Sequence, residues 1–120
     1  MKEKLDLLRK DLFLELYCRA MNSSNPGFDG IIITNDKKIY HYSSHFNISS
    51  HTETEKISDG EELNNEIYLE LQNYINENIA GKEFEPIMMR DSNYHVYVNG
   101  LDIINHLEIY NDLKNIISKK

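Results

Sequence analysis

The sequence predicts an α+β domain in which a four-stranded antiparallel sheet packs against helices. Three segments carry apolar residues at helical spacing, and short runs rich in β-branched and aromatic residues lie between them. Turn-forming residues divide these runs into two hairpins, so the predicted order is α-ββ-α-ββ-α. With 120 residues, 40% of them hydrophobic, the chain is predicted to form a single domain over residues 1–120.

The first predicted helix spans residues 2–21. Cys18 lies one turn from Leu14 and Met21, which is a common setting for an unreactive core cysteine. Apolar residues surround most of this helix, so we expect more than one side to be covered, by the sheet and by a helix, a partner or a second copy of the chain. One leucine stripe runs along it: Leu5, Leu8, Leu12 and Leu16.

The first hairpin follows a predicted break at residues 22–30, where Pro-Gly and Asp-Gly pairs end the helix. Its strands are residues 31–34 and 39–42, and Asn35-Asp36 forms the turn. Residues 43–56 are polar and rich in Ser and Thr, which predicts a long loop of the kind that is either mobile or functional.

A second helix is predicted to begin near Ser58 and to end before Gly81, a residue suited to the left-handed conformation that closes helices. Ser58 with Glu61 would form a capping box at its start. The pair Asp59 and Glu62 offers the same motif one residue later. Its core stripe is predicted to contain Leu63, Ile67, Leu71, Tyr74, Ile75 and Ile79.

The second hairpin is predicted from residues 84–90 and 94–98, with its turn at residues 91–93. Asn99-Gly100 is then expected to turn the chain into a final helix over residues 102–118. This helix completes the predicted fold and adds a third apolar stripe to cover the sheet.

The charge of the chain is concentrated in its middle third. Net charge is −7, and residues 53–91 contain eleven acidic and only three basic residues. Such a surface repels nucleic acid and anionic membranes and attracts basic proteins. We therefore expect the outer face of the second helix to bind a basic partner, although a solvated face that keeps the protein soluble is the alternative. The carboxylates expected to do so are Glu62, Glu66, Glu70 and Glu77.

Eight tyrosines and no tryptophan point to a second contact surface. Alternation along the strands places His41 on the face of Ile39, and Tyr97 on the face of His95. If both faces lie on a side that no helix covers, they form an aromatic–imidazole surface, and we expect His41 and Tyr97 to contact a partner there. Tyrosine is also a good strand former, which explains its abundance without any partner.

Three of the five histidines, His41, His45 and His51, lie close together in the sequence. Histidines four residues apart bind zinc when they share one side of a helix. His41 lies in a predicted strand, however, where four residues span about 13 Å, so we expect no metal and no other cofactor. A metal-dependent enzyme that uses these histidines, with Glu53 and Glu55 as further ligands, is the weakest alternative.

No catalytic motif supports an enzyme. The sequence contains neither a glycine-rich phosphate-binding loop nor a serine nucleophile elbow. His51-Thr52-Glu53 matches half of a zinc-deaminase signature, but the required cysteine pair is missing because Cys18 is the only cysteine. A single cysteine fits a reducing compartment, and neither a secretory signal nor a run of about 18 apolar residues is present. We therefore expect a cytoplasmic protein, and the abundance of residues encoded by AT-rich codons suggests a bacterial or phage source.

These features predict a small protein-interaction protein that inhibits a basic partner such as a nuclease or a toxin. Immunity proteins, antitoxins and phage counter-defence factors are of this kind. Its acidic surface would exclude a phosphate-bearing substrate by charge and would not touch nucleic acid itself. A homodimer is compatible with the apolar first helix. The alternative is a small-ligand sensor or accessory domain, with a pocket between sheet and helices and the 43–56 loop as its lid.

Overall fold

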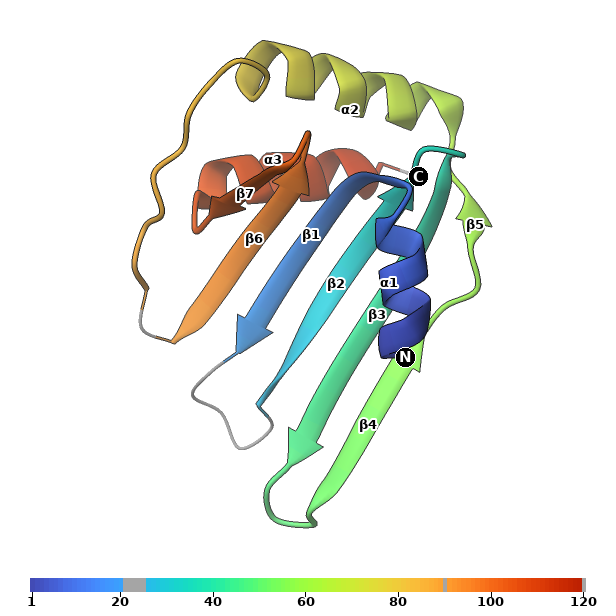
Figure 1. The fold of residues 1–120 in the computed structure, drawn as a ribbon, viewed down its shortest axis with the longest axis vertical. Helices are drawn as coiled ribbons and strands as arrows, with labels where there is room; N and C mark the ends of the chain where they lie inside the picture. Colours follow the sequence, from blue (N-terminus) through green and yellow to red (C-terminus); the bar gives the residue numbers. More distant parts are fainter. Residues whose placement is uncertain (21–25, 90, 120) are drawn as a thin grey trace.

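The computed structural model describes residues 1–20, 26–89 and 91–119. These residues form three helices and seven strands (Figure 1). The elements in chain order are α1 (Lys2–Arg9), β1 (Leu12–Ala20), β2 (Gly27–Thr34), β3 (Lys38–Asn47), β4 (Thr52–Ile57), β5 (Glu61–Glu62), α2 (Asn65–Asn78), β6 (Ser92–Val98), β7 (Leu101–Ile104) and α3 (Leu107–Ile117).

The strands pair in one antiparallel sheet with the order β4-β3-β2-β1-β6-β7, and the short β5 pairs with β3. The helices α2 and α3 pack on one face of this sheet, and α1 packs on the other (Figure 1). The predicted α+β class is therefore confirmed. The predicted four-stranded sheet and the order α-ββ-α-ββ-α are wrong, because two further long strands join the sheet and only one of the two predicted hairpins forms.

The largest error concerns the first helix, which ends at Arg9 and is followed by the central strand β1. Leu14 and Leu16 on β1 are buried under α2 and α3, while Tyr17 points to the face that carries α1. Pairing with β2 on one side and β6 on the other stabilises this segment as a strand and outweighs its helical spacing. Met21, the predicted end of the helix, lies outside the described residues, as do residues 22–25 of the predicted break.

The segment predicted as a polar loop forms a hairpin instead. The strand β3 continues to Asn47, and β4 begins at Thr52. His51 closes the turn between them with a φ of 54°, a left-handed conformation. Along β3 the burial of Tyr42 continues at Ser44, which is only 6% exposed, so the two-residue alternation extends past the predicted strand end. The 43–56 segment is therefore a paired hairpin and does not supply a loop that closes over a pocket.

The helix α2 begins later than predicted. Asn64 is its N-cap, and its side-chain Oδ1 accepts a hydrogen bond from the backbone N–H of Glu66 at 2.7 Å. Both predicted capping boxes are wrong, because Glu61 and Glu62 form β5 beside β3. Gly81 does adopt a positive φ of 75° just past the helix.

Among the described residues, no helix is both long and apolar enough to cross a membrane.

The second hairpin forms between β6 and β7, whereas the prediction paired residues 84–90 with residues 94–98. Asn99 and Gly100 both have positive φ, 52° and 75°, which matches the two-residue turn that connects β6 to β7. Residues 82–89 are not a strand; this segment follows the outer edge of β7, where the Ile87 N–H donates to the carbonyl of Ile104 at 3.2 Å. Because β7 occupies Leu101–Ile104, the last helix, α3, begins at Leu107 and is shorter than predicted. Arg90, the last residue of the predicted strand, lies outside the described residues.

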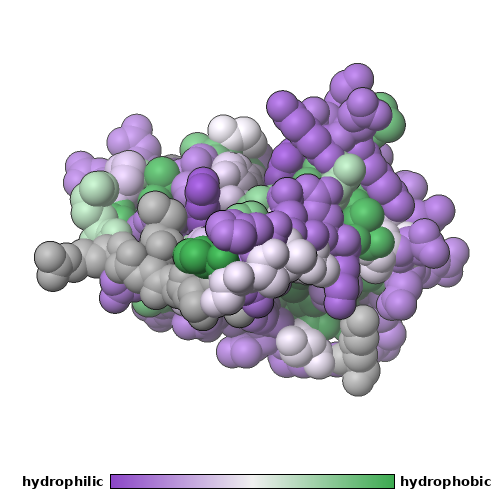
Figure 2. Space-filling view, turned by 90° about the horizontal axis from the view of Figure 1, so that it is seen from below, coloured by the Kyte–Doolittle hydropathy of each residue, from purple (hydrophilic) through white to green (hydrophobic). Residues whose placement is uncertain are grey.

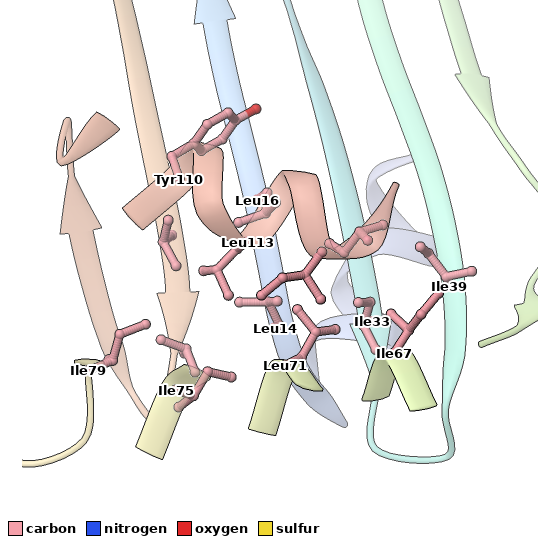
Figure 3. Packing of buried hydrophobic residues seen from close by; sticks show 14 of the residues in the cluster. Leu14, Leu16, Ile33, Ile39, Ile67, Leu71, Ile75, Ile79, Tyr110 and Leu113 are labelled. Carbon is pink, nitrogen blue, oxygen red and sulfur yellow. The ribbon is translucent and has the colours of Figure 1, made fainter. Parts of the chain in front are cut away.

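The main core lies between the sheet and the two helices α2 and α3 (Figure 3). Side chains from α2 and α3 meet the inward residues of the central strands there. The labelled members are Leu14, Leu16, Ile33, Ile39, Ile67, Leu71, Ile75, Ile79, Tyr110 and Leu113 (Figure 3). This layer explains why the stripe predicted for the second helix is largely correct: Leu63, Ile67, Leu71, Ile75 and Ile79 are all buried.

The buried Tyr110 makes the stability of the fold sensitive to high pH. Burial raises the pKa of its phenol to about 12. This value lies above the unfolded-state pKa of about 10. The protonated Tyr110 therefore contributes fully to the free energy of unfolding below pH 10, and this contribution is lost between about pH 10 and pH 12. We expect Tyr110→Phe to lose about 2 kcal/mol less stability over this range than the unmodified protein. Urea unfolding at a series of pH values measures it, and parallel profiles for the two proteins would contradict it.

Candidate functional site

The sheet face under α1 contains a carboxylate that is almost completely buried. Glu15 on β1 is 1% exposed. Arg9, at the end of α1, donates from Nε to Oε1 at 2.8 Å and from Nη2 to Oε2 at 2.7 Å. The hydroxyl of Tyr42 on β3 donates to Oε2 of the same carboxylate. The three side chains therefore join α1, β1 and β3 around one buried charge.

The pKa values of Arg9 and Tyr42 are both raised in this network. The hydrogen bond to Glu15 raises the pKa of the Arg9 guanidinium, and burial is the main cause of the raised pKa of the Tyr42 phenol. The Tyr42 ring lies directly over Gly30 on β2, where a Cβ atom would be 2.0 Å from the ring Cζ. Glycine at this position thus gives the ring the room to reach Glu15.

Aromatic rings continue from this network across four strands, β3, β2, β1 and β6. Tyr42 lies 6.0 Å from Phe28, measured between ring centroids, and Phe28 lies 5.5 Å from Tyr17. Tyr17 lies 5.5 Å from the imidazole of His95, which stacks on Tyr97 at 5.6 Å with the planes 9° apart. Spacings of this size are those at which aromatic pairs attract each other. We call these five residues the aromatic row.

A cleft of about 610 Å³ lies between α1 and the aromatic row, and we call it the α1 cleft. Four charged side chains line it, two of each sign: Lys2, Arg9, Glu15 and Glu55. The rest of the lining is apolar or aromatic and consists of Met1, Leu5, Leu12, Tyr17, Phe28 and Tyr97. The cleft combines a largely apolar wall with a few polar groups, which is the composition of small-molecule sites.

His41 and Tyr97, predicted to share a contact surface, lie on opposite faces of the sheet. His41 pairs with Ile31, which packs toward α2 and α3, whereas Tyr97 pairs with Glu15 on the α1 face. Ile39, the third expected member, is 1% exposed within the core. The predicted aromatic–imidazole surface is therefore wrong as a grouping. His41 lines an open groove of about 790 Å³ beside α3, and Tyr97 lines the α1 cleft.

The predicted carboxylates lie on and beside α2. Glu66, Glu70 and Glu77 are on the helix side opposite its buried stripe, and α2 contains no basic residue. Glu62 is exposed in β5, directly opposite Lys38 of β3. The structure thus brings three of the four residues together on one helix face, and the fourth lies in β5, before the helix begins. We call Glu66, Glu70 and Glu77 the α2 carboxylate stripe.

The remaining histidines make ordinary side-chain contacts. His45 hydrogen-bonds to Asp29 at 3.2 Å, and the ring of His51 lies against Phe46. Within the described parts of the chain, no group of three His, Cys, Asp or Glu side chains is placed to hold a metal ion. The sequence cluster of histidines is therefore spread along β3 and its turn.

Cys18, predicted on a helix, lies half-buried on β1. Burial raises the pKa of its thiol, which leaves less of the reactive thiolate at neutral pH. In comparisons with known proteins, neither a protein-family model nor a curated protein matches this chain.

Proposed function

We propose that this chain is a small cytoplasmic protein-interaction protein that inhibits a basic partner, such as a nuclease or a toxin. This is the role of immunity proteins, antitoxins and phage counter-defence factors. The observation that supports it is the α2 carboxylate stripe, three carboxylates on one exposed helix face without a basic residue in the same helix. A surface of this charge steers a basic partner toward it and lowers its affinity for nucleic acid.

The length of the stripe fits an extended basic groove. Eleven residues separate Glu66 from Glu77, which corresponds to roughly 16 Å along a helix. Nucleases bind the phosphate backbone with rows of Lys and Arg side chains, and a row of carboxylates on a rigid helix can contact the same side chains. Occupation of that groove would exclude the substrate.

Two of the predicted residues are partly neutralised within the chain. Glu70 forms an ion pair with Lys119 at 2.6 Å, and Glu62 lies opposite Lys38 in the sheet. Neighbouring lysines reduce the field that an approaching partner meets. We therefore expect Glu66 and Glu77 to contribute most.

Among the described residues, most of the exposed hydrophobic side chains lie outside α2. Exposed hydrophobic side chains are scattered over several elements, and the view from below shows hydrophobic residues divided by hydrophilic ones (Figure 2). Recognition by charge is therefore favoured over burial of a large apolar patch. Among the large hydrophobic residues that the structure describes, Leu7 (64%) and Met88 (91%) have the largest exposed fractions.

Charge reversal tests this proposal. The tagged chain is used to isolate its partner from a host extract, and association rates are then measured over a range of salt concentrations. The double variant Glu66→Lys/Glu77→Lys is expected to associate about tenfold more slowly, with a shallower salt dependence, because the attraction is long-range and screened by salt.

The matched control is Glu83→Lys/Glu85→Lys, which changes net charge by the same amount on the exposed 82–89 segment. We expect this variant to associate at a rate close to that of the unmodified chain. Equal losses for both variants would show that only total charge matters, and no loss in either would reject the proposal.

A further inference from the structure

We propose that the α1 cleft binds one small molecule that is planar, aromatic and uncharged. This inference does not depend on the proposed protein partner, because the cleft and the α2 carboxylate stripe lie on opposite sides of the sheet (Figure 1). It follows from the size of the cleft, the rings that line it and the balance of its charges.

The size of the cleft suits a small molecule. Its volume of about 610 Å³ lies within the range of roughly 300–1,000 Å³ that ligand pockets occupy. The helix α1 covers it from one side through Leu5, which is 4% exposed, and the sheet closes the other. Arg9 ties the C-terminal end of the same helix to the sheet through Glu15, so the position of α1 beside the cleft is fixed.

The rings in the cleft favour a planar aromatic ligand. Tyr17 and Phe28 lie 5.5 Å apart with their planes 34° apart, and Tyr97 adds a third ring to the lining. A planar molecule in the cleft would contact these rings together with the apolar side chains of Leu5 and Leu12, which also line it. Contacts between aromatic rings add about 0.5–1.5 kcal/mol beyond the area that they bury.

The charges in the cleft disfavour an ionic ligand. The side-chain charges of Lys2 and Arg9 are balanced by those of Glu15 and Glu55. The Nε and Nη2 groups of Arg9 that face the sheet donate to Glu15, and Nη2 also donates to the Tyr42 hydroxyl at 3.5 Å. An ion entering the cleft would lose hydration without meeting a net opposite charge. An uncharged molecule does not pay this penalty.

A structural alternative exists, in which the Glu15–Arg9 pair only anchors α1 and the cleft holds solvent. The two alternatives predict different behaviour toward a probe of the proposed class. The probe is N-phenyl-1-naphthylamine, a neutral naphthyl dye whose fluorescence rises in apolar sites. Anionic anilinonaphthalene sulfonate and cationic thioflavin T serve as charged counterparts.

We expect the full chain to bind the neutral dye saturably, with one dye per chain, and to bind the two charged dyes at least about tenfold more weakly. Leu12→Trp fills the cleft and is expected to weaken binding by about tenfold or more. Tyr97→Ala, which removes a half-buried ring, is the second test variant. Leu7→Ala is the matched control, because Leu7 is on α1 but is 64% exposed and does not line the cleft.

Circular dichroism first establishes that each variant is folded, and Tyr97→Ala decides the result if Leu12→Trp is not. Binding that is weakened in the folded cleft variants and unchanged in Leu7→Ala supports the proposal. Absence of saturable binding, equal binding of the charged dyes, or unchanged binding in the folded cleft variants would overturn it. Amide chemical-shift changes that are confined to the groove beside His41, in an NMR titration with the neutral dye, would overturn it as well. Unchanged dye binding in Glu66→Lys/Glu77→Lys keeps this result separate from the protein-partner proposal.

Discussion

Leu71→Ala is expected to lower the free energy of unfolding by about 4 kcal/mol. Leu71 lies in the middle of α2 and is 0% exposed. Its side chain points into the layer formed with Leu14 of β1 and Leu113 of α3 (Figure 3). Truncation removes buried methyl groups and leaves a cavity that helices on one side and a sheet on the other cannot fill by collapse.

Urea unfolding measures this loss, and Leu69→Ala is the matched control. Leu69 is on the same helix, two residues away, and is 49% exposed. We expect the control to change stability by less than about 1 kcal/mol, since surface substitutions have small effects. Similar losses at the two positions would show that α2 does not pack on the sheet in the described orientation.

Arg9→Ala is expected to destabilise the fold by about 2–3 kcal/mol. The substitution leaves the Glu15 carboxylate buried, with the Tyr42 hydroxyl as its one remaining side-chain donor among the described residues. Loss of one partner of a fully buried pair costs about 3–5 kcal/mol, and the expected value is smaller because the Arg9 side chain is 38% exposed and partly hydrated already.

Glu15→Gln should cost less than Arg9→Ala, because it removes the buried charge and leaves Arg9 free to turn toward water. Arg19→Ala is the control, an arginine on the same sheet face that is exposed. Urea unfolding again provides the measurement. A loss for Arg9→Ala no larger than that of the control would indicate that water, and not the protein, solvates the Glu15 carboxylate.

The sequence predicted the α+β class and the first hairpin because both depend on local patterns. The β-branched residues 31–34 and the turn at Asn35-Asp36 specify a hairpin without reference to the rest of the chain. The segment at residues 12–20 carries two patterns at once, since Leu12 and Leu16 fit a helix while Leu14, Leu16 and Cys18 fit a strand. Pairing with β6, more than 70 residues later, decides between them, and local spacing does not contain that information.

The candidate sites also differ in whether local sequence patterns predict them. The α2 carboxylate stripe was predictable, because Glu66, Glu70 and Glu77 are related by the period of one helix. The sequence did not predict the Arg9–Glu15 pair or the aromatic row, since their members come together only through the register of strands far apart in the chain. The one sequence signal was the acidic Glu15 between Leu14 and Leu16, a charge at the centre of an apolar strand.

The central position of β1 has a consequence for synthesis of the protein. Strands β1 to β4 form a continuous meander and can pair as each leaves the ribosome. The edge of β1 that does not pair with β2 stays unpaired until β6 has been translated. Until residues 92–98 emerge, the growing chain exposes an unpaired edge beside Leu14 and Leu16, and the part of the apolar face that α3 covers stays exposed until α3 follows. Unpaired edges of this kind recruit other strands. The nascent protein is therefore most prone to aggregation in the interval between translation of its fourth strand and of its sixth.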